Sequence, residues 1–156
     1  MKSTTLVDSP LGPLTLVADD DALVGLYMVD QRHRPALEHL RDDSRLPAVK
    51  EQLTAYWEGD LRHFDLPVRM TGTVFQREVW AALTTIPYGQ TWSYGRLATA
   101  IGRPGASRAV GLANGKNPIS IVVPCHRVVG STGSMTGYGG GLERKKWLLD
   151  LERGLT

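Results

Sequence analysis

Two prolines bound a short apolar segment in the C-terminal half of the chain, and the only cysteine follows the second proline. Residues 119–123, between Pro118 and Pro124, are mostly apolar and β-branched, which predicts a buried strand or extended segment. Pro124 fixes its own φ angle and favours an extended conformation of the residue before it. We therefore expect Cys125 just where regular structure stops, at the wall of a pocket.

The cysteine is followed directly by a histidine. A free thiol with a pKa of about 8.5 is mostly protonated at neutral pH, so Cys125 needs a base to act as a nucleophile. His126 is the nearest one, but it can cooperate with Cys125 only across a turn or through a water. A carboxylate should orient the imidazole, and the C-terminal segment offers Glu143, Asp150 and Glu152. Spacing alone leaves open that the cysteine is an inert buried residue.

At 156 residues, 42% of them hydrophobic, the chain can bury a core as one domain or as two small lobes. It has no run of 18 apolar residues, and residues 1–16 lack the pattern of a signal peptide. We expect a cytoplasmic protein that does not use a membrane. One cysteine forms no internal disulfide, and no cluster of Cys and His has metal-ligand spacing, so neither a metal nor a cofactor is expected.

Charge is distributed unevenly between the two halves. Residues 1–70 hold eight Lys and Arg against twelve Asp and Glu, a net charge of −4, whereas residues 71–156 hold ten against four, a net charge of +6. A basic C-terminal half suits a polyanion such as nucleic acid. Charge alone is equally compatible with a basic surface that only keeps the protein in solution.

The first half of the chain shows a strand pattern followed by a helix pattern. The expected elements are strands at 4–7, 14–18 and 23–28 in an antiparallel meander, a helix from Pro47 to 59–60, and a short edge strand at 64–68. Asp19, Asp20 and Asp21 point in different directions and favour a solvated turn over a metal site. His33, His39 and His63 are expected on the surface, and residues 1–70 are expected to be a scaffold without a reactive group.

The second half shows helical spacing. Helices are predicted at 73–83, 94–101 and 106–114, and the last two, joined by a turn with glycine, have the shape of a helix-turn-helix. The last helix carries mostly small side chains and one arginine, Arg108. Small residues allow close approach to the minor groove with little reading of sequence, and one long side chain could enter the base stack. The alternative is two packed helices with Arg108 on the surface.

The motifs around the cysteine resemble a known family. Residues 124–128 (Pro-Cys-His-Arg-Val), Asn117-Pro118 before them and residues 137–142 after them are similar to the O6-alkylguanine-DNA alkyltransferases, a DNA repair family. The resemblance covers about half of the chain, from Phe75 to Glu152, and is weaker in the N-terminal half. It implies an α+β fold: an N-terminal lobe, residues 1–70, with a three-stranded antiparallel sheet and a helix, and a helical lobe, residues 71–156, with the helix-turn-helix and the cysteine.

The resemblance also implies roles for single residues. Cys125 would accept the alkyl group, His126 would remove the thiol proton through a water, and Glu152 would orient the imidazole. Arg108 would fill the gap left by a rotated-out nucleotide, and Tyr94 would push on its phosphate and help protonate the departing guanine. Asn117 would tie the recognition helix to the active-site turn. The other implied contacts are Ala106, Ser107, Ala109 and Gly111 with DNA, and Tyr138, Val128, Ser131, Met135 and Gly139 with the alkylated base.

The implied activity is irreversible, stoichiometric transfer of the alkyl group from O6-alkylguanine, and from O4-alkylthymine, to the protein's own cysteine. The implied partner is double-stranded DNA, contacted by a monomer through the minor groove, with cooperative binding left open. Gly130 and Gly139 replace larger residues of some relatives, which suggests a roomier pocket. A damage-sensing DNA binder, a transcription regulator and a thiol hydrolase are the alternatives, and Cys125, the small helix and the lack of a recognisable oxyanion hole argue against them in turn.

Overall fold

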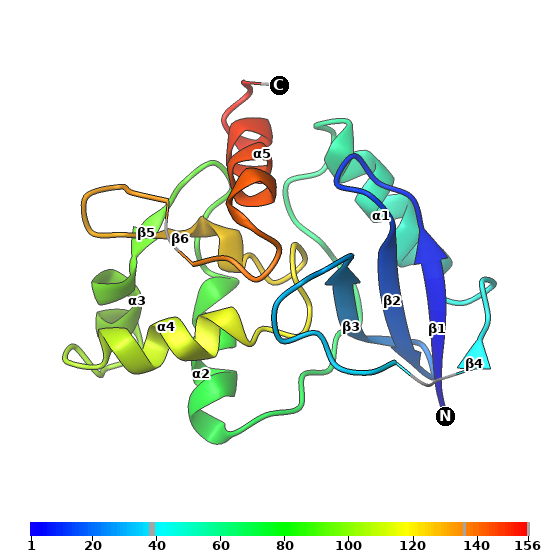
Figure 1. Cartoon of the computed structure of the whole chain (residues 1–156), viewed down its shortest axis with the longest axis horizontal. Helices are drawn as coiled ribbons and strands as arrows, with labels where there is room; N and C mark the ends of the chain where they lie inside the picture. The colour runs from blue at the N-terminus through cyan, green and yellow to red at the C-terminus, as the bar shows by residue number, and fades with distance from the viewer. Residues whose placement is uncertain (38–39, 136, 156) are drawn as a thin grey trace.

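The computed structural model describes residues 1–37, 40–135 and 137–155. Its first half is built on a sheet with the strand order β3-β2-β1-β4 (Figure 1). The strands are β1 (Lys2–Val7), β2 (Leu14–Asp19), β3 (Ala22–Met28) and β4 (Leu40–Arg41). The first three form the predicted antiparallel meander, and β4 adds a parallel pairing with β1. The sequence does not predict β4, because two residues are too few to show a pattern.

One helix, α1 (Pro47–Trp57), lies beside the sheet (Figure 1). It begins at the predicted proline, whose fixed φ angle suits the first turn of a helix. Its residues Val49 and Leu53 are buried in one core with Leu14 and Leu16 of β2. The sheet and α1 therefore bury one face of β2 together.

Three helices follow in the second half: α2 (Val74–Leu83), α3 (Tyr94–Ala100) and α4 (Ser107–Gly115). Thr73 caps α2, because its hydroxyl accepts from the backbone N–H of Gln76 while the Gln76 side chain accepts from the N–H of Thr73. Ser93 caps α3 in the same way through the N–H of Arg96. The helices predicted at these places are confirmed, with bounds that differ by one residue at most.

Four further elements of the second half complete the fold. These are a 3-10 turn η1 (Cys125–Arg127), the short parallel pair β5 (Trp92–Ser93) and β6 (Val128–Val129), and the last helix α5 (Leu142–Glu152). The ring of Trp147 on α5 lies 5.9 Å from that of Trp57 on α1. One continuous core joins both halves. Within the described residues, no helix has the length and apolar character needed to span a membrane.

Two segments predicted to be extended differ in the structure. Residues 119–123 are buried except for the half-buried Val122, but they form a tight turn in which the N–H of Val123 donates to the carbonyl of Ile119 at 3.0 Å and Ile121 has a φ of 74°. The prediction was wrong because it read apolar β-branched residues as a strand. Of residues 64–68, predicted as an edge strand, only Val68 forms an isolated bridge, to Leu23.

Candidate active site

Cys125 begins the 3-10 turn that follows the tight turn. Its thiol is almost fully buried, with 4% of the residue exposed. The side chain of Asn117 holds the tight turn closed: its amide donates to the carbonyl of Val123 at 2.8 Å, and its oxygen accepts from the N–H of Ile119 at 3.0 Å. Asn114, in the last turn of α4, donates to the carbonyl of Cys125 at 3.4 Å. The cysteine is therefore held by side chains at the end of α4 and just after it.

The imidazole of His126 is fully buried against the end of α5. Its Nε2 lies 2.8 Å from Oε2 of Glu152, the one of the three candidate carboxylates that reaches it. Asp150 instead pairs with Lys146 on the surface of α5. No described residue offers a hydrogen bond to Nδ1 of His126. An ionised carboxylate can only accept, so Nε2 carries the proton and a neutral imidazole has its lone pair on Nδ1.

Glu152 is the centre of a buried polar cluster. Arg127 binds both of its oxygens, with Nε at 2.8 Å from Oε1 and Nη2 at 3.0 Å from Oε2, and the hydroxyl of Tyr56 donates to Oε2 at 2.5 Å. Burial alone would raise the pKa of Glu152, but the hydrogen bonds and positive charge of His126 and Arg127 outweigh it and hold that pKa far below its usual range. Glu152 is therefore ionised at neutral pH.

Burial favours the neutral forms of His126 and Cys125, whereas particular neighbours favour the charged forms. Burial lowers the pKa of His126, although Glu152 acts in the opposite direction. Burial likewise raises the pKa of the Cys125 thiol, while the side chain of Asn117, the charge of Lys145 and the hydroxyl of Ser120 lower it. A neutral imidazole can accept a proton, and the ammonium can stabilise a thiolate.

Lys145 is the buried cation next to the thiol. It is 0% exposed, and its Nζ donates to the carbonyl of Val128 at 2.5 Å. Burial lowers its pKa to about 8, with Cys125 acting in the opposite direction, so the ammonium form predominates at pH 7. The sequence reading missed Lys145 because it stands in a run of three basic residues, which is typical of an exposed helix face.

An open cleft of about 470 Å³ lies next to this buried cluster. It brings together five predicted site residues, which are Tyr94, Arg108, Gly111, Tyr138 and Gly139. The hydroxyl of Tyr138 is buried without a hydrogen-bond partner among the described residues. Burial is the largest cause that raises the pKa of Tyr138, and the charge of Cys125 raises it further. Tyr138 therefore lines the cleft and is close enough to Cys125 for their charges to interact.

Other predicted contacts do not line this cleft. Ala106, Ser107 and Ala109 lie at or near the start of α4, Val128 is fully buried in β6, and Ser131 is exposed. Met135 lines a separate hollow of about 170 Å³ with Val129 and residues of α5, because the loop turns its side chain toward that helix. The structure therefore does not bring Met135 to the cleft, and its contact with the alkylated base stays a prediction.

The two glycines expected to enlarge the pocket, Gly130 and Gly139, both line the cleft. A Cβ on Gly130 would lie 2.3 Å from the hydroxyl oxygen of Ser134, so the loop itself occupies that position. A Cβ on Gly139 would lie 3.4 Å from the carbonyl oxygen of Arg32. A side chain at Gly130 would therefore meet Ser134, whereas one at Gly139 would make only ordinary contact, and the roomier pocket stays a prediction.

Residues 1–70 contribute to the site, contrary to the expectation that they form only a scaffold. Tyr56 of α1 reaches Glu152, and Gln31 donates to the hydroxyl of Ser120 at 3.4 Å. Arg32 and His33 line the cleft. No local pattern in the sequence could have shown these long-range contacts. His33 and His63 are exposed as predicted, and His39 lies outside the described residues.

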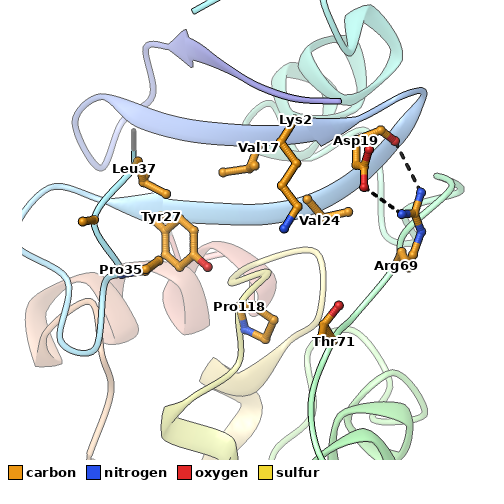
Figure 2. A pocket seen from close by; sticks show the side chains of 11 residues that line it. Lys2, Val17, Asp19, Val24, Tyr27, Pro35, Leu37, Arg69, Thr71 and Pro118 are labelled. Atoms are coloured by element: carbon orange, nitrogen blue, oxygen red, sulfur yellow. Dashed lines mark hydrogen bonds and ion pairs between the residues drawn. The ribbon is translucent and has the colours of Figure 1, made fainter. Parts of the chain in front are cut away.

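A second hollow, of about 340 Å³, lies between the sheet and the segment that leads to α2 (Figure 2). Lys2 and Tyr27 project toward it, and Arg69 on its rim is paired with Asp19. Neither the thiol nor the cluster around Glu152 lines it, so the cleft beside Tyr138 remains the candidate site. No three His, Cys, Asp or Glu side chains of the described residues are grouped so as to hold a metal.

Comparisons with known proteins agree with this fold and site. A family model described as 6-O-methylguanine DNA methyltransferase, DNA binding domain, matches residues 74–154, and one described as the ribonuclease-like domain of the same proteins matches residues 3–70. The chain belongs to the 6-O-methylguanine DNA methyltransferase family. The resemblance seen in the sequence and the α+β fold that it implied are thereby confirmed.

The individual relatives are similar over nearly their whole length. A methylated-DNA–protein-cysteine methyltransferase of Mycolicibacterium paratuberculosis is 57% identical over 148 residues, covering 94% of this chain and 90% of the relative. One from Methanosarcina acetivorans is 44% identical, covering 94% and 96%. The crystal structure of Mycobacterium tuberculosis OGT in complex with DNA matches with a TM-score of 0.94 and 49% identity, covering 99% of this chain and 94% of that one.

Proposed function

We propose that the protein repairs DNA by transferring an alkyl group from the O6 atom of guanine to Cys125. One observation carries this proposal: the chain's single thiol is buried close to the charge of Lys145, and the next residue is a buried histidine whose tautomer is fixed by Glu152. Relatives named methylated-DNA–protein-cysteine methyltransferase support the same reaction. In this proposal residues 1–70 support the reacting lobe, residues 71–156.

The chemistry is a displacement at the alkyl carbon. Nδ1 of His126 takes the thiol proton through a water, and the charge of Lys145 stabilises the thiolate that forms. The sulfur then bonds to the alkyl carbon as the bond from that carbon to O6 breaks, and the electron pair stays on the guanine. Tyr94, at the cleft, donates a proton to the departing base and is reprotonated from solvent, while His126 releases to solvent the proton it took from the thiol. The products are a neutral guanine and a thioether, with both side chains back in their starting forms.

The alkylated base must leave the duplex to meet a buried thiol. Extruding it costs a few kcal/mol, and less for a damaged pair. In our proposal α3 and α4 act as a helix-turn-helix, the small residues of α4 approach the minor groove, and Arg108 fills the gap in the stack. The base enters the cleft beside Tyr138. O4-alkylthymine presents its alkyl group on a similar exocyclic oxygen and is included as a substrate.

The proposed reaction occurs once per molecule. A thioether is chemically stable, and the chain has no second cysteine that could regenerate the thiol. We propose that the protein is a monomer and that it binds DNA largely without regard to sequence. We also propose that it works in the cytoplasm. A titration of duplex DNA with increasing amounts of the protein would show whether several molecules bind cooperatively along it.

The test is the intact mass of the protein after incubation with a duplex that carries one O6-methylguanine. We expect the mass to rise by one methyl group and the modified peptide to contain Cys125. Cys125→Ala should gain no mass but still bind the duplex. A protein that binds the duplex and stays unmodified would instead be a damage sensor, and the transfer proposal would be wrong.

A further inference from the structure

A loop of the N-terminal half, residues 29–34, reaches the edge of the cleft. It is fixed to the end of β3 by two long side chains. Gln31 accepts from the N–H of Met28 at 2.9 Å, and Arg34 donates to the carbonyl of Met28 at 2.8 Å and to the hydroxyl of Thr15 at 3.0 Å. The loop therefore has a defined conformation, within which His33 keeps a left-handed backbone with a φ of 62°.

The same loop is bonded directly to the segment that carries Tyr138. The N–H of Arg32 donates to the carbonyl of Gly139 at 2.7 Å. Arg144, at the start of α5, bridges the two segments, with Nη1 at 2.7 Å from the carbonyl of Val29 and at 3.2 Å from that of Gly140. These bonds hold the loop at the rim of the cleft rather than leaving it loose in solvent.

The side chains of Arg32 and His33 line the cleft together with Arg108 and Leu112 of α4. Both residues are exposed, and no hydrogen bond or ion pair joins either side chain to another described residue. The hydrogen bonds of the loop thus hold Arg32 at the part of the cleft where α4 is proposed to contact DNA. Its guanidinium has no partner among the described residues. Arg108 adds a second positive charge to the same cleft.

We propose that Arg32 binds a backbone phosphate of the DNA strand whose alkylated nucleotide enters the cleft. The inference rests on the DNA binding of the proposed function and adds a contact from residues 1–70, which the helix-turn-helix alone does not include. A guanidinium binds a phosphate through two parallel hydrogen bonds, and a strand crossing the cleft has phosphates on both sides of the extruded nucleotide. His33 borders the same contact.

The salt dependence of duplex binding tests this contact. Each phosphate neutralised by a cation contributes about −0.9 to the slope of log K against log salt concentration. Arg32→Gln should make the slope less steep by about 0.9 and weaken binding about tenfold near physiological salt, on alkylated and unmodified duplex alike. Arg32→Lys should keep the slope.

A matched control is Arg41→Gln, which removes the same charge from β4 at the far edge of the sheet (Figure 1). It should leave the slope unchanged. An Arg32→Gln slope equal to that of wild type or of Arg41→Gln would overturn the inference, provided that the wild type binds duplex and accepts the methyl group. A wild type that does neither would instead overturn the proposed function.

Discussion

Glu152 joins the chemistry of the site to the stability of the fold. Its carboxylate orients His126, neutralises Arg127 and accepts from Tyr56, all in a buried environment. Removing one partner from such a cluster leaves another charge buried without compensation, which typically costs several kcal/mol. The carboxylate should therefore affect both reaction rate and unfolding.

Glu152→Gln tests this double role. Glutamine can donate as well as accept, so the tautomer of His126 is no longer fixed, and Arg127 loses its counter-charge. We expect the rate of alkyl transfer to fall about a hundredfold and the free energy of unfolding to fall by about 3 kcal/mol, measured by single-turnover kinetics and denaturant titration. Tyr56→Phe, which removes only one hydrogen bond to the same oxygen, should lower the rate less than tenfold. Wild-type kinetics in Glu152→Gln would contradict the assigned role.

A substitution of Lys145 should change the reaction rate without lowering the stability of the fold. Replacement by methionine keeps the volume but removes the charge near the thiol, so the pKa of Cys125 should rise further and the transfer rate should reach its maximum at a higher pH. The protein should be no less stable, because burying the ammonium is itself costly. A pH profile of transfer from free alkylated guanine gives the first result, and thermal unfolding gives the second. An unchanged profile would show that the ammonium does not act on the sulfur.

Some residues of the site could be predicted from the sequence, and others could not. Cys125 and His126 are adjacent in the chain, and Glu152 was selected among three carboxylates only through the family resemblance. Arg127 and Lys145 were missed because buried charges look like surface charges until their partners are known. Contacts such as that between Tyr56 and Glu152 join residues far apart in the chain, which no local pattern reveals.

At the level of elements, the helices were predictable and the turn was not. Thr73 and Ser93 cap their helices through side-chain hydrogen bonds that local sequence dictates. The turn at 119–123 depends instead on Asn117, whose amide satisfies two buried backbone groups and holds Ile121 at a φ that β-branched residues rarely adopt. A reading based on β-branched residues alone favours a strand there.

The helix α4 gives a test at the same scale. Its side chains in the cleft, including Arg108, face the proposed DNA site, whereas Cys125 is buried and does not line that cleft. Arg108→Ala should slow reaction with alkylated duplex at least tenfold and leave the reaction with free O6-alkylguanine within about twofold. Parallel rate measurements on the two substrates check this. Equal losses on both would exclude a role in filling the base stack.

At the scale of the whole molecule, one core joins the sheet, the helices and the active-site turn. The polar cluster of Glu152 is buried at that junction, between α1, η1 and α5. Unfolding should consequently expose the site and both halves together, as one cooperative transition.

Acid should weaken this junction. The pKa of Glu152 is depressed in the folded state, so its contribution to stability is present above its unfolded value of about 4.5 and is lost as the pH falls below it. His126, whose folded pKa is also depressed, adds a loss that begins below about 6.5. Denaturant unfolding between pH 7 and 3 should show stability falling toward acid, with a shallower fall in Glu152→Gln. An equal fall in both proteins would place the acid sensitivity elsewhere.

The central claim is that one buried thiol accepts an alkyl group and keeps it. Its most direct measurement is the amount of labelled methyl transferred from an excess of O6-methylguanine duplex to a known amount of active protein. The account predicts a burst that stops at one methyl per molecule, all of it on Cys125. Continued release of repaired DNA beyond one equivalent, or label on any other residue, would contradict it.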